Sequence, residues 1–476
     1  MMLNKTWLYF LLLSPLTAFA VPDLSLEVHR FRSGLNSFAE VSVYIVGSSL
    51  TCNDQMADYG VEYTLIIESA SGKVVSGDKF RLKNTGCPAK DLIDVKRYVL
   101  ETGKYFINVE MTDIHDALNT ITVRQAIDVE NPAYLDYISD VQLLSVIRTE
   151  QEGKSALHKS GLYLEPLAFN YYYPALDKLN IYVETYNTDK LQGQPYMQYT
   201  LRPLSGDIPA AIVAHKKVVK QSVSANVYQM DINALISGPY ILETTLFDGN
   251  KNAVAKREVE FSRYNPTGDS VFISSGSLNL ESSFIRKIPD DSLDYNLRAM
   301  LPIISSVEAD IMNSLLDKGS SEAKRFFIHR FWTEEAGKFA DQAFGKYMNV
   351  AKVIDDMYRS GFGYGFETDR GHTFLKYGRP DNIIGEEDEP SAPPYEIWFY
   401  YHFPATHQSN VRFIFYNPSL AHNSYQLLHS TATGEIKNER WEIELYRDAT
   451  LETPGVNEKV MGENVHRNAR KYFENY

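Results

Sequence analysis

Apolar and polar residues alternate along much of the first half of the chain, and this period of two predicts β-strands. Residues 24–28, 41–45, 61–67 and 105–110 follow the pattern, separated by turns that contain glycine or serine. Short strands at such near-regular spacing are typical of a β-sandwich. We therefore predict an immunoglobulin-like sandwich over residues 21–130.

The same plan recurs further along the chain. Tyr63-Thr64-Leu65 is repeated as Tyr199-Thr200-Leu201, and Gly103-Lys104-Tyr105 is matched by Gly238-Pro239-Tyr240. The offsets are 136 and 135 residues, so the register is held over a long span. A repeat of this length indicates two tandem sandwiches of one type, the second over residues 131–263.

Beyond the second sandwich the apolar period changes to that of a helix. The apolar positions from Leu297 to Ile304 recur at helical spacing, with a break predicted at Pro302. Ser320 is expected to cap the next helix, and a longer helix is predicted from about 337 to 359. Residues 264–360 are therefore predicted to form a helical segment.

Residues 361–476 are predicted to form an α+β domain with an antiparallel sheet, and we expect residues 264–476 to form one unit. Aromatic and β-branched runs there indicate strands. The predicted strands are 372–377, 395–402, 411–417, 424–428 and 441–445.

One glycine-rich stretch in this C-terminal part has a distinctive order of residues. Residues 361–381 read GFGYGFETDRGHTFLKYGRPD, and such a density of glycine marks backbone with positive φ or close approach. The stretch resembles the signature of the GWxTD domain-containing family of exported bacterial proteins, with Phe366 where that family has tryptophan. The resemblance implies a cell-envelope protein and no particular activity. The matching positions are Gly365, Phe366, Thr368, Asp369, Arg370, Gly371, Tyr377, Gly378, Pro380 and Asp381. Gly371 and Gly378 are expected to be critical for the fold.

The N-terminus indicates export. Residues 1–20 have a single lysine, an apolar centre and an Ala-Phe-Ala end, as in a secretory signal peptide. No later stretch is apolar enough over about 18 residues to span a membrane. In an oxidising compartment the only two cysteines, Cys52 and Cys87, are expected to form one disulfide. We expect a periplasmic protein or one associated with the outer membrane or cell surface.

Charge and histidine spacing exclude several kinds of partner. The formal net charge of −14 makes nucleic acid an improbable ligand, because the phosphate backbone would be repelled. His402 and His407 are five residues apart, but they straddle Pro404 and lack a helical metal-binding pattern. No metal or cofactor is expected.

Asp369, Arg370 and Asp381 are the candidates for acid, base or anion-binding roles. The structural alternative is that both carboxylates cap turns by accepting backbone N–H groups, while Arg370 pairs with Asp369 or with the acidic run 386–389. We favour this alternative, so no catalytic residue is assigned.

The expected function is that of a non-catalytic interaction or assembly module whose partners are other envelope proteins. One alternative is a hydrolase of an envelope polymer that acts through Asp369 and Asp381. Another is a glycan-binding module, because the aromatic runs 171–173 and 398–401 could stack on sugar rings.

Overall fold

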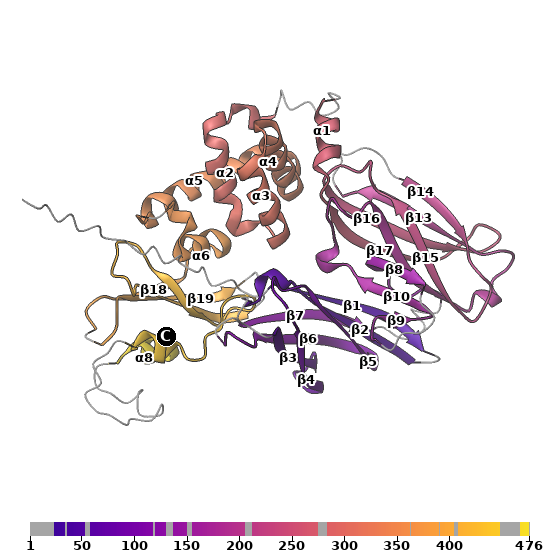
Figure 1. The fold of residues 1–476 in the computed structure, drawn as a ribbon, viewed down its shortest axis with the longest axis horizontal. Helices are drawn as coiled ribbons and strands as arrows, with labels where there is room; N and C mark the ends of the chain where they lie inside the picture. The colour runs from indigo at the N-terminus through magenta and orange to yellow at the C-terminus, as the bar shows by residue number, and fades with distance from the viewer. Residues whose placement is uncertain are drawn as a thin grey trace, which may run out of the picture.

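The computed structural model describes residues 23–33, 36–52, 58–117, 120–129, 137–149, 155–204, 212–274, 283–361, 363–389, 391–403, 408–447 and 467–475. The signal peptide predicted at residues 1–20 lies outside these ranges. Within them, two pairs of facing sheets form the first half of the chain, and a further sheet lies near the C-terminus beyond a set of helices (Figure 1). No helix in the described ranges combines the length and the apolar character needed to cross a membrane.

The first half of the chain begins with two antiparallel sheets that share one core. The predicted alternation places Val41, Val43, Leu65 and Ile67 in that core, where none has exposed surface. The two cysteines form the predicted disulfide, Cys52–Cys87. Across one sheet the order is β1 (Leu24–Ser33), β2 (Asn36–Ile45) and β5 (Leu92–Val99); across the other it is β4 (Val74–Asn84), β3 (Tyr59–Ser69), β6 (Gly103–Asp113) and β7 (Thr120–Val129).

A second pair of sheets follows, again around a single core. An inserted segment between β8 and β12 adds short strands to both sheets. One sheet has the order β15 (Val223–Asp231), β12 (Lys178–Tyr186), β8 (Gln142–Thr149), β10 (Leu162–Pro166) and β9 (His158–Lys159). The other has the order β11 (Tyr171–Tyr172), β17 (Ala253–Arg263), β16 (Gly238–Phe247), β13 (Tyr196–Pro203) and β14 (Ile212–Lys217).

The second pair of sheets repeats the strand order of the first. The order β4-β3-β6-β7 corresponds to β14-β13-β16-β17, and β1-β2-β5 corresponds to β8-β12-β15. Tyr105 lies opposite Ser69, six residues after Tyr63, whereas Tyr240 lies opposite Pro203, four residues after Tyr199. The two registers therefore differ by two residues, which keeps every side chain on the same face because the side-chain period of a strand is two.

The helices of the next segment begin and end near the predicted positions. Met300 ends α2, and Pro302 lies in the 3₁₀ turn that follows, as predicted. The Ser320 hydroxyl accepts the Ala323 N–H at 3.2 Å and caps α4. The helices are α1 (Pro266–Ser274), α2 (Leu293–Met300), α3 (Ser306–Lys318), α4 (Ser321–Ala336) and α5 (Ala340–Tyr358).

The C-terminal sheet is covered on both faces. Trp398 and Tyr400 point to α5 and α6, whereas Ile397 and Phe399 point to α7 and α8. The buried faces explain why this strand is apolar at almost every position, since a strand covered on one side only would alternate. The sheet has the order β18 (Asn382–Glu386), β19 (Tyr395–Phe403), β20 (Gln408–Tyr416) and β21 (Gln426–Ser430), and its helices are α6 (Asp369–Tyr377), α7 (Trp441–Leu445) and α8 (Ala469–Asn475).

Two predicted strands are helices. Residues 372–377 belong to α6 because the Thr368 side chain accepts the Gly371 N–H at 3.2 Å and starts a helix there. Residues 441–445 form α7, whose Trp441 and Leu445, four residues apart, are buried on one face. Runs this short do not contain enough turns for their periodicity to distinguish strand from helix.

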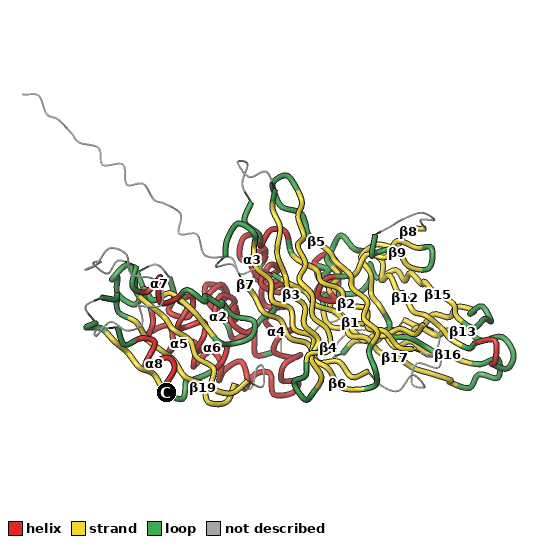
Figure 2. Tube along the Cα trace, turned by 90° about the horizontal axis from the view of Figure 1, so that it is seen from below, coloured by secondary structure: helices red, strands yellow, loops and turns green. Residues whose placement is uncertain are grey.

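The first sandwich lies between the C-terminal sheet and the second sandwich, and it contacts both (Figure 1, Figure 2). On the C-terminal side, the Gly434 N–H donates to the Thr122 carbonyl of β7 at 3.0 Å, and Lys437 pairs with Glu110 at 3.1 Å. The chain therefore folds back so that its last unit touches its first.

A buried lysine joins the first sandwich to the second. Lys159 of β9 lies 3.5 Å from Glu40 of β2 and 3.4 Å from Glu184 of β12, and its side chain is 11% exposed. The Lys159 ammonium also lies 2.9 Å from the centre of the Phe31 ring. Burial lowers the pKa of Lys159, while both carboxylates act in the opposite direction.

Candidate functional site

The signature segment connects α5 to β18, and two of its glycines allow backbones to touch. A Cβ on Gly371 would lie 2.0 Å from the Gly365 carbonyl oxygen, and a Cβ on Gly365 would lie 2.3 Å from the Asp355 carbonyl oxygen. The Gly365 N–H donates to the Asp355 carboxylate at 2.7 Å. Phe366 is 1% exposed and fills the core beside Tyr295. The segment thus fastens α6 to α5.

Asp369 is bound to the edge of the C-terminal sheet. Its residue is exposed, and one carboxylate oxygen accepts the Leu427 N–H of β21 at 2.6 Å. Asp369 therefore joins the first turn of α6 to a strand; the prediction that it caps its own turn was wrong, because Thr368 is the cap there.

Arg370 is buried, at 4% exposure, and its ion pair is with Glu396 of the sheet rather than with Asp369 or the acidic run 386–389. One nitrogen pairs with Glu396 at 2.6 Å, and another donates to the Asn423 side chain at 3.0 Å. The guanidinium also lies over the rings of Tyr425 and Tyr358, at 3.9 and 4.8 Å from their centres. Arg370 therefore links α6 to β19 and to the loop before β21.

The end of the signature makes a tight turn into the sheet. Gly378 has φ +83°, in the region that favours glycine, and its carbonyl accepts the Tyr400 hydroxyl at 3.0 Å. Asp381 accepts the Tyr401 N–H at 2.7 Å, while the Tyr377 hydroxyl bonds to Glu435. Asp369 is thus attached to β21, whereas Arg370 and Asp381 are attached to opposite ends of β19, and none of the three lines the cavity described below.

The histidines and the acidic run also have structural contacts. His429 accepts the Asn438 N–H at 3.0 Å, and burial lowers its pKa to about 4. Glu389 accepts the hydroxyls of Tyr395 and Tyr446, both at 2.7 Å. Among the described residues, no group of three or more His, Cys, Asp or Glu side chains could hold a metal ion, and His407 lies outside them.

The aromatic run of β19 is not available for sugar stacking. Trp398, Phe399 and Tyr400 are at most 3% exposed, and only Tyr401, at 48%, reaches the surface. The suggestion that this run could stack on sugar rings was wrong for its first three residues, because helices cover both faces of the sheet. Of the run 171–173, Tyr173 is exposed, whereas Tyr171 is buried and lines the cavity.

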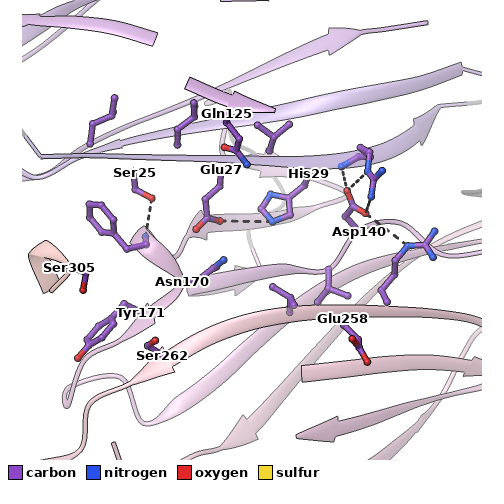
Figure 3. Close-up of a pocket in the computed structure, with 18 of the residues that line it drawn as sticks. Ser25, Glu27, His29, Gln125, Asp140, Asn170, Tyr171, Glu258, Ser262 and Ser305 are labelled. Carbon is purple, nitrogen blue, oxygen red and sulfur yellow. Dashed lines mark hydrogen bonds and ion pairs between the residues drawn. The ribbon is translucent and has the colours of Figure 1, made fainter. Parts of the chain in front are cut away.

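A cavity of about 820 Å³ lies where the two sandwiches meet the helices. Its walls come from β1, β17, the segment 169–171 and the facing parts of α3 and α4 (Figure 3). Concave sites of roughly 300–1,000 Å³ at the junction of domains are where small ligands bind most often. The cavity is therefore the second candidate site.

Glu27 and His29 are two residues apart on β1 and point to the same side of the strand (Figure 3). The Glu27 carboxyl lies 3.9 Å from Nε2 of His29, and the side chains are 13% and 9% exposed. Burial raises the pKa of Glu27 to about 8, although a backbone hydrogen bond from Asn170 opposes the shift. Burial also lowers the pKa of His29, against the pull of Asp140 and Glu40. Both side chains are therefore mainly neutral at pH 7.

The charged residues around the cavity pair with one another. Arg30 holds Asp140 through two nitrogens, at 2.8 and 3.0 Å, and Arg257 approaches the same carboxylate at 3.9 Å. On the helical side, Arg330 pairs with Glu308 at 3.3 Å. The Arg330 side chain is 10% exposed, and although burial lowers its pKa, the nearby Glu334 and Glu308 carboxylates outweigh this effect and raise it.

Two consecutive residues beside the cavity have left-handed backbone. Phe169 has φ 56° and Asn170 has φ 48°. Asparagine tolerates this region, whereas a bulky residue such as phenylalanine is a genuine outlier there. Such strain costs on the order of 1–3 kcal/mol per residue and tends to occur at binding sites. The Ser25 hydroxyl holds this turn in place by accepting the Phe169 N–H at 2.9 Å.

Sequence reasoning did not find this site, because its residues are far apart along the chain. Glu27 and His29 look like the solvent side of an alternating strand, and Asn170 precedes an ordinary aromatic run. The local signal for the left-handed turn is weak, since Asn170 favours such a backbone but Phe169 does not.

Comparisons with known proteins leave the class of protein open. No family model matches the chain, and no curated protein matches it. Among solved structures, red sea bream transglutaminase is 13% identical with a TM-score of 0.18, over 51% of this chain and 31% of that one. The fibronectin(III)-like modules of Clostridium thermocellum CbhA are 10% identical with a TM-score of 0.15, over 48% of this chain and 86% of that one.

A DUF4785 family protein from Legionella pneumophila is 11% identical with a TM-score of 0.16, over 51% of this chain and 56% of that one. This chain thus spans about a third of the transglutaminase chain and just over half of the Legionella chain. TM-scores this low do not define a shared fold.

Proposed function

We propose that the chain is an exported cell-envelope protein that acts as a non-catalytic interaction or assembly module. The observation that carries this proposal is the way the signature residues are used. Asp369 and Asp381 each accept a backbone N–H, and Arg370 is committed to Glu396 and to two aromatic rings. These contacts hold the fold together, and neither carboxylate lines the cavity, so they favour a structural role for the signature.

The proposed layout has four parts. Two tandem immunoglobulin-like sandwiches, residues 21–130 and 131–263, precede a helical segment, 264–360, and a GWxTD α+β domain, 361–476. The repeated strand order supports one type of sandwich. Residues 264–476 would form one unit because α5 contributes to both the helical core and the core of the C-terminal sheet.

Export is supported by the Cys52–Cys87 disulfide, because such bonds persist in oxidising compartments. The partners would be other envelope proteins, met in the periplasm or at the outer surface. Membership of the GWxTD family remains part of the same proposal and rests on residues 365–381.

Complementation of a deletion strain tests the non-catalytic role. The double variant Asp369→Asn/Asp381→Asn keeps a carbonyl oxygen for each backbone N–H and removes both charges. It should accumulate at the wild-type level and restore the cellular phenotype. Gly371→Ala serves as the structural comparison, and it should lower the amount of folded protein and the phenotype together.

A catalytic role would give the opposite result. If the double variant melts like the wild type, accumulates normally and still fails to complement, the charges act in chemistry and the proposal is wrong.

A further inference from the structure

The cavity between the two sandwiches has the features of a ligand site of defined chemistry. It lies apart from the signature segment, so its test stands whether or not the chain is an assembly module. We propose that it binds an uncharged, hydroxyl-rich ligand, namely a neutral saccharide unit.

The first argument is that the charges of the cavity are already compensated. Asp140 lies between Arg30 and Arg257, Glu308 pairs with Arg330, and Glu258 pairs with Lys256 at 2.9 Å. A phosphate or carboxylate ligand would have to compete with these carboxylates for the arginines. A cation would similarly compete with the arginines for Asp140, and the described residues form no metal-binding group. A neutral ligand breaks none of these pairs.

The second argument comes from hydrogen-bonding atoms that have no partner among the described residues. They are Glu27 Oε2, His29 Nδ1 and Asn170 Oδ1, which have no exposed surface and belong to residues that line the cavity. Figure 3 shows the three side chains around one space. Leaving buried polar atoms unpaired is unfavourable, so a ligand that satisfies them gains affinity.

Hydroxyl groups fit these three atoms because each hydroxyl both donates and accepts. The Asn170 carbonyl oxygen requires a donor. A neutral Glu27 carboxyl offers both functions, and Nδ1 of a neutral imidazole takes either role according to its tautomer. A saccharide carries several adjacent hydroxyls and can meet mixed requirements of this kind within one small volume.

The third argument is that the site is held in shape before a ligand arrives. The left-handed turn at Phe169 and Asn170 is fixed from β1 by Ser25 and Glu27. This turn presents the Asn170 amide and, next to it, the aromatic side chains of Phe169 and Tyr171. The apolar face of a pyranose ring packs on such aromatic surface, while its hydroxyls reach the polar groups.

Binding is measured on the folded, full-length mature chain by saturation-transfer NMR and calorimetry. The probes are the neutral disaccharides N,N′-diacetylchitobiose, maltose and cellobiose, and glucose 6-phosphate is the anionic probe. At least one neutral disaccharide should bind, and glucose 6-phosphate should bind less well because its phosphate meets Asp140 and Glu308.

Asn170→Gly is the decisive variant, because glycine accepts the left-handed backbone and only the amide is lost. It should weaken disaccharide binding about tenfold, as expected for one hydrogen bond in a buried site. Asn187→Gly is the matched control, since Asn187 also has a positive φ, 52°, and is not on the lining. It should bind like the wild type.

Glu27→Gln should also keep binding within about threefold, because it replaces one neutral group by another. His29→Phe should lose it. Failure of all three neutral disaccharides to bind the folded chain would overturn the proposal. So would tighter binding of glucose 6-phosphate, or a disaccharide affinity that is equal in Asn170→Gly and Asn187→Gly.

Discussion

Tyr105 and Tyr240 make the same hydrogen bond in the two sandwiches. Each hydroxyl donates to the carbonyl oxygen four residues upstream, that of Glu101 at 3.0 Å and that of Ile236 at 2.9 Å. This arrangement is the tyrosine corner of immunoglobulin-like sandwiches, in which the hydroxyl ties the start of a strand to the preceding connection. This shared hydrogen bond explains why Gly-x-Tyr recurs in the sequence.

The two tyrosine corners should contribute equally to the free energy of unfolding. Tyr105→Phe and Tyr240→Phe should each lower the free energy of unfolding by about 1 kcal/mol, because each leaves a carbonyl without its donor. Denaturant titration measures the change. Tyr196→Phe is the control, since no hydrogen bond of its hydroxyl is found within the described ranges. If Tyr196→Phe lowered the free energy of unfolding as much as the other two variants, the corner hydrogen bonds would contribute nothing to stability.

Alanine in place of either critical glycine of the signature should destabilise the fold, but for a different physical reason at each position. Gly371→Ala places a Cβ 2.0 Å from a backbone oxygen, and the backbone must move, so a loss of about 3 kcal/mol or more is expected. Gly378→Ala meets no atom within 4 Å but has φ +83°, and about 1–2 kcal/mol is expected. Thermal and denaturant unfolding show which of the two variants loses more stability.

Gly345 of α5 supplies the control for these two variants. A Cβ there meets nothing within 4 Å, and the residue is helical, so Gly345→Ala should stabilise by about 1 kcal/mol. Equal losses at Gly371 and Gly378 would contradict the close approach between Gly371 and the Gly365 carbonyl oxygen.

Glu27 should make the stability of the chain depend on pH. Its pKa is raised from 4.5 to about 8, so the folded state holds a proton that the unfolded state releases. Stability should therefore fall as pH rises from about 4.5 to 8 and level off above that. At about 1.4 kcal/mol per pH unit, the upper limit of this loss is about 5 kcal/mol.

Glu27→Gln should remove this fall, because the amide does not ionise. The difference in unfolding free energy between variant and wild type should grow from pH 5 to pH 8. Because His29 lies 3.9 Å from Glu27, the comparison is repeated in the His29→Phe background; Asp140, Arg30 and Arg257 also face the cavity and are present in every protein. Parallel stability curves would show that Glu27 is ionised in the folded state.

Lys159 should be required for the stability of the junction between the two sandwiches. Lys159→Met leaves Glu184 buried without its cation, and a loss of about 3 kcal/mol is expected. Lys159→Met/Glu184→Gln should recover part of it, because the uncompensated charge is then gone. Lys178→Met, at the exposed start of β12, is the control and should change stability by less than about 0.5 kcal/mol. If Lys159 only filled space, the double variant would be no more stable than Lys159→Met alone.

Much of the fold can be predicted from local patterns. Alternation identified the strands that bury Val41 and Leu65, and Ser320 and Pro302 marked helix boundaries where the backbone requires them. The failures lie in short segments. Residues 372–377 and 441–445 are decided by a cap and by tertiary packing, and neither is visible in a run of five or six residues.

The cavity could not be predicted in the same way. Its polar groups come from β1, from a turn between β10 and β11, and from β17, and only the packing of the sandwiches brings them together. The raised pKa of Glu27 is a consequence of that packing. A glutamate at an alternating position indicates a solvated face unless the partner surface is known.

The bond between Gly434 and Thr122 determines the order in which the molecule can be completed. β7 is the outer strand of its sheet, and the Gly434 N–H that bonds to its Thr122 carbonyl is synthesised more than 300 residues later. At about 5–20 residues per second, that interval is roughly 15–60 s. During this time the strand presents unpaired backbone groups, which other chains could add to. A late part of the chain thus supplies a backbone donor to an early strand, and a chain truncated before residue 434 would leave the Thr122 carbonyl without it.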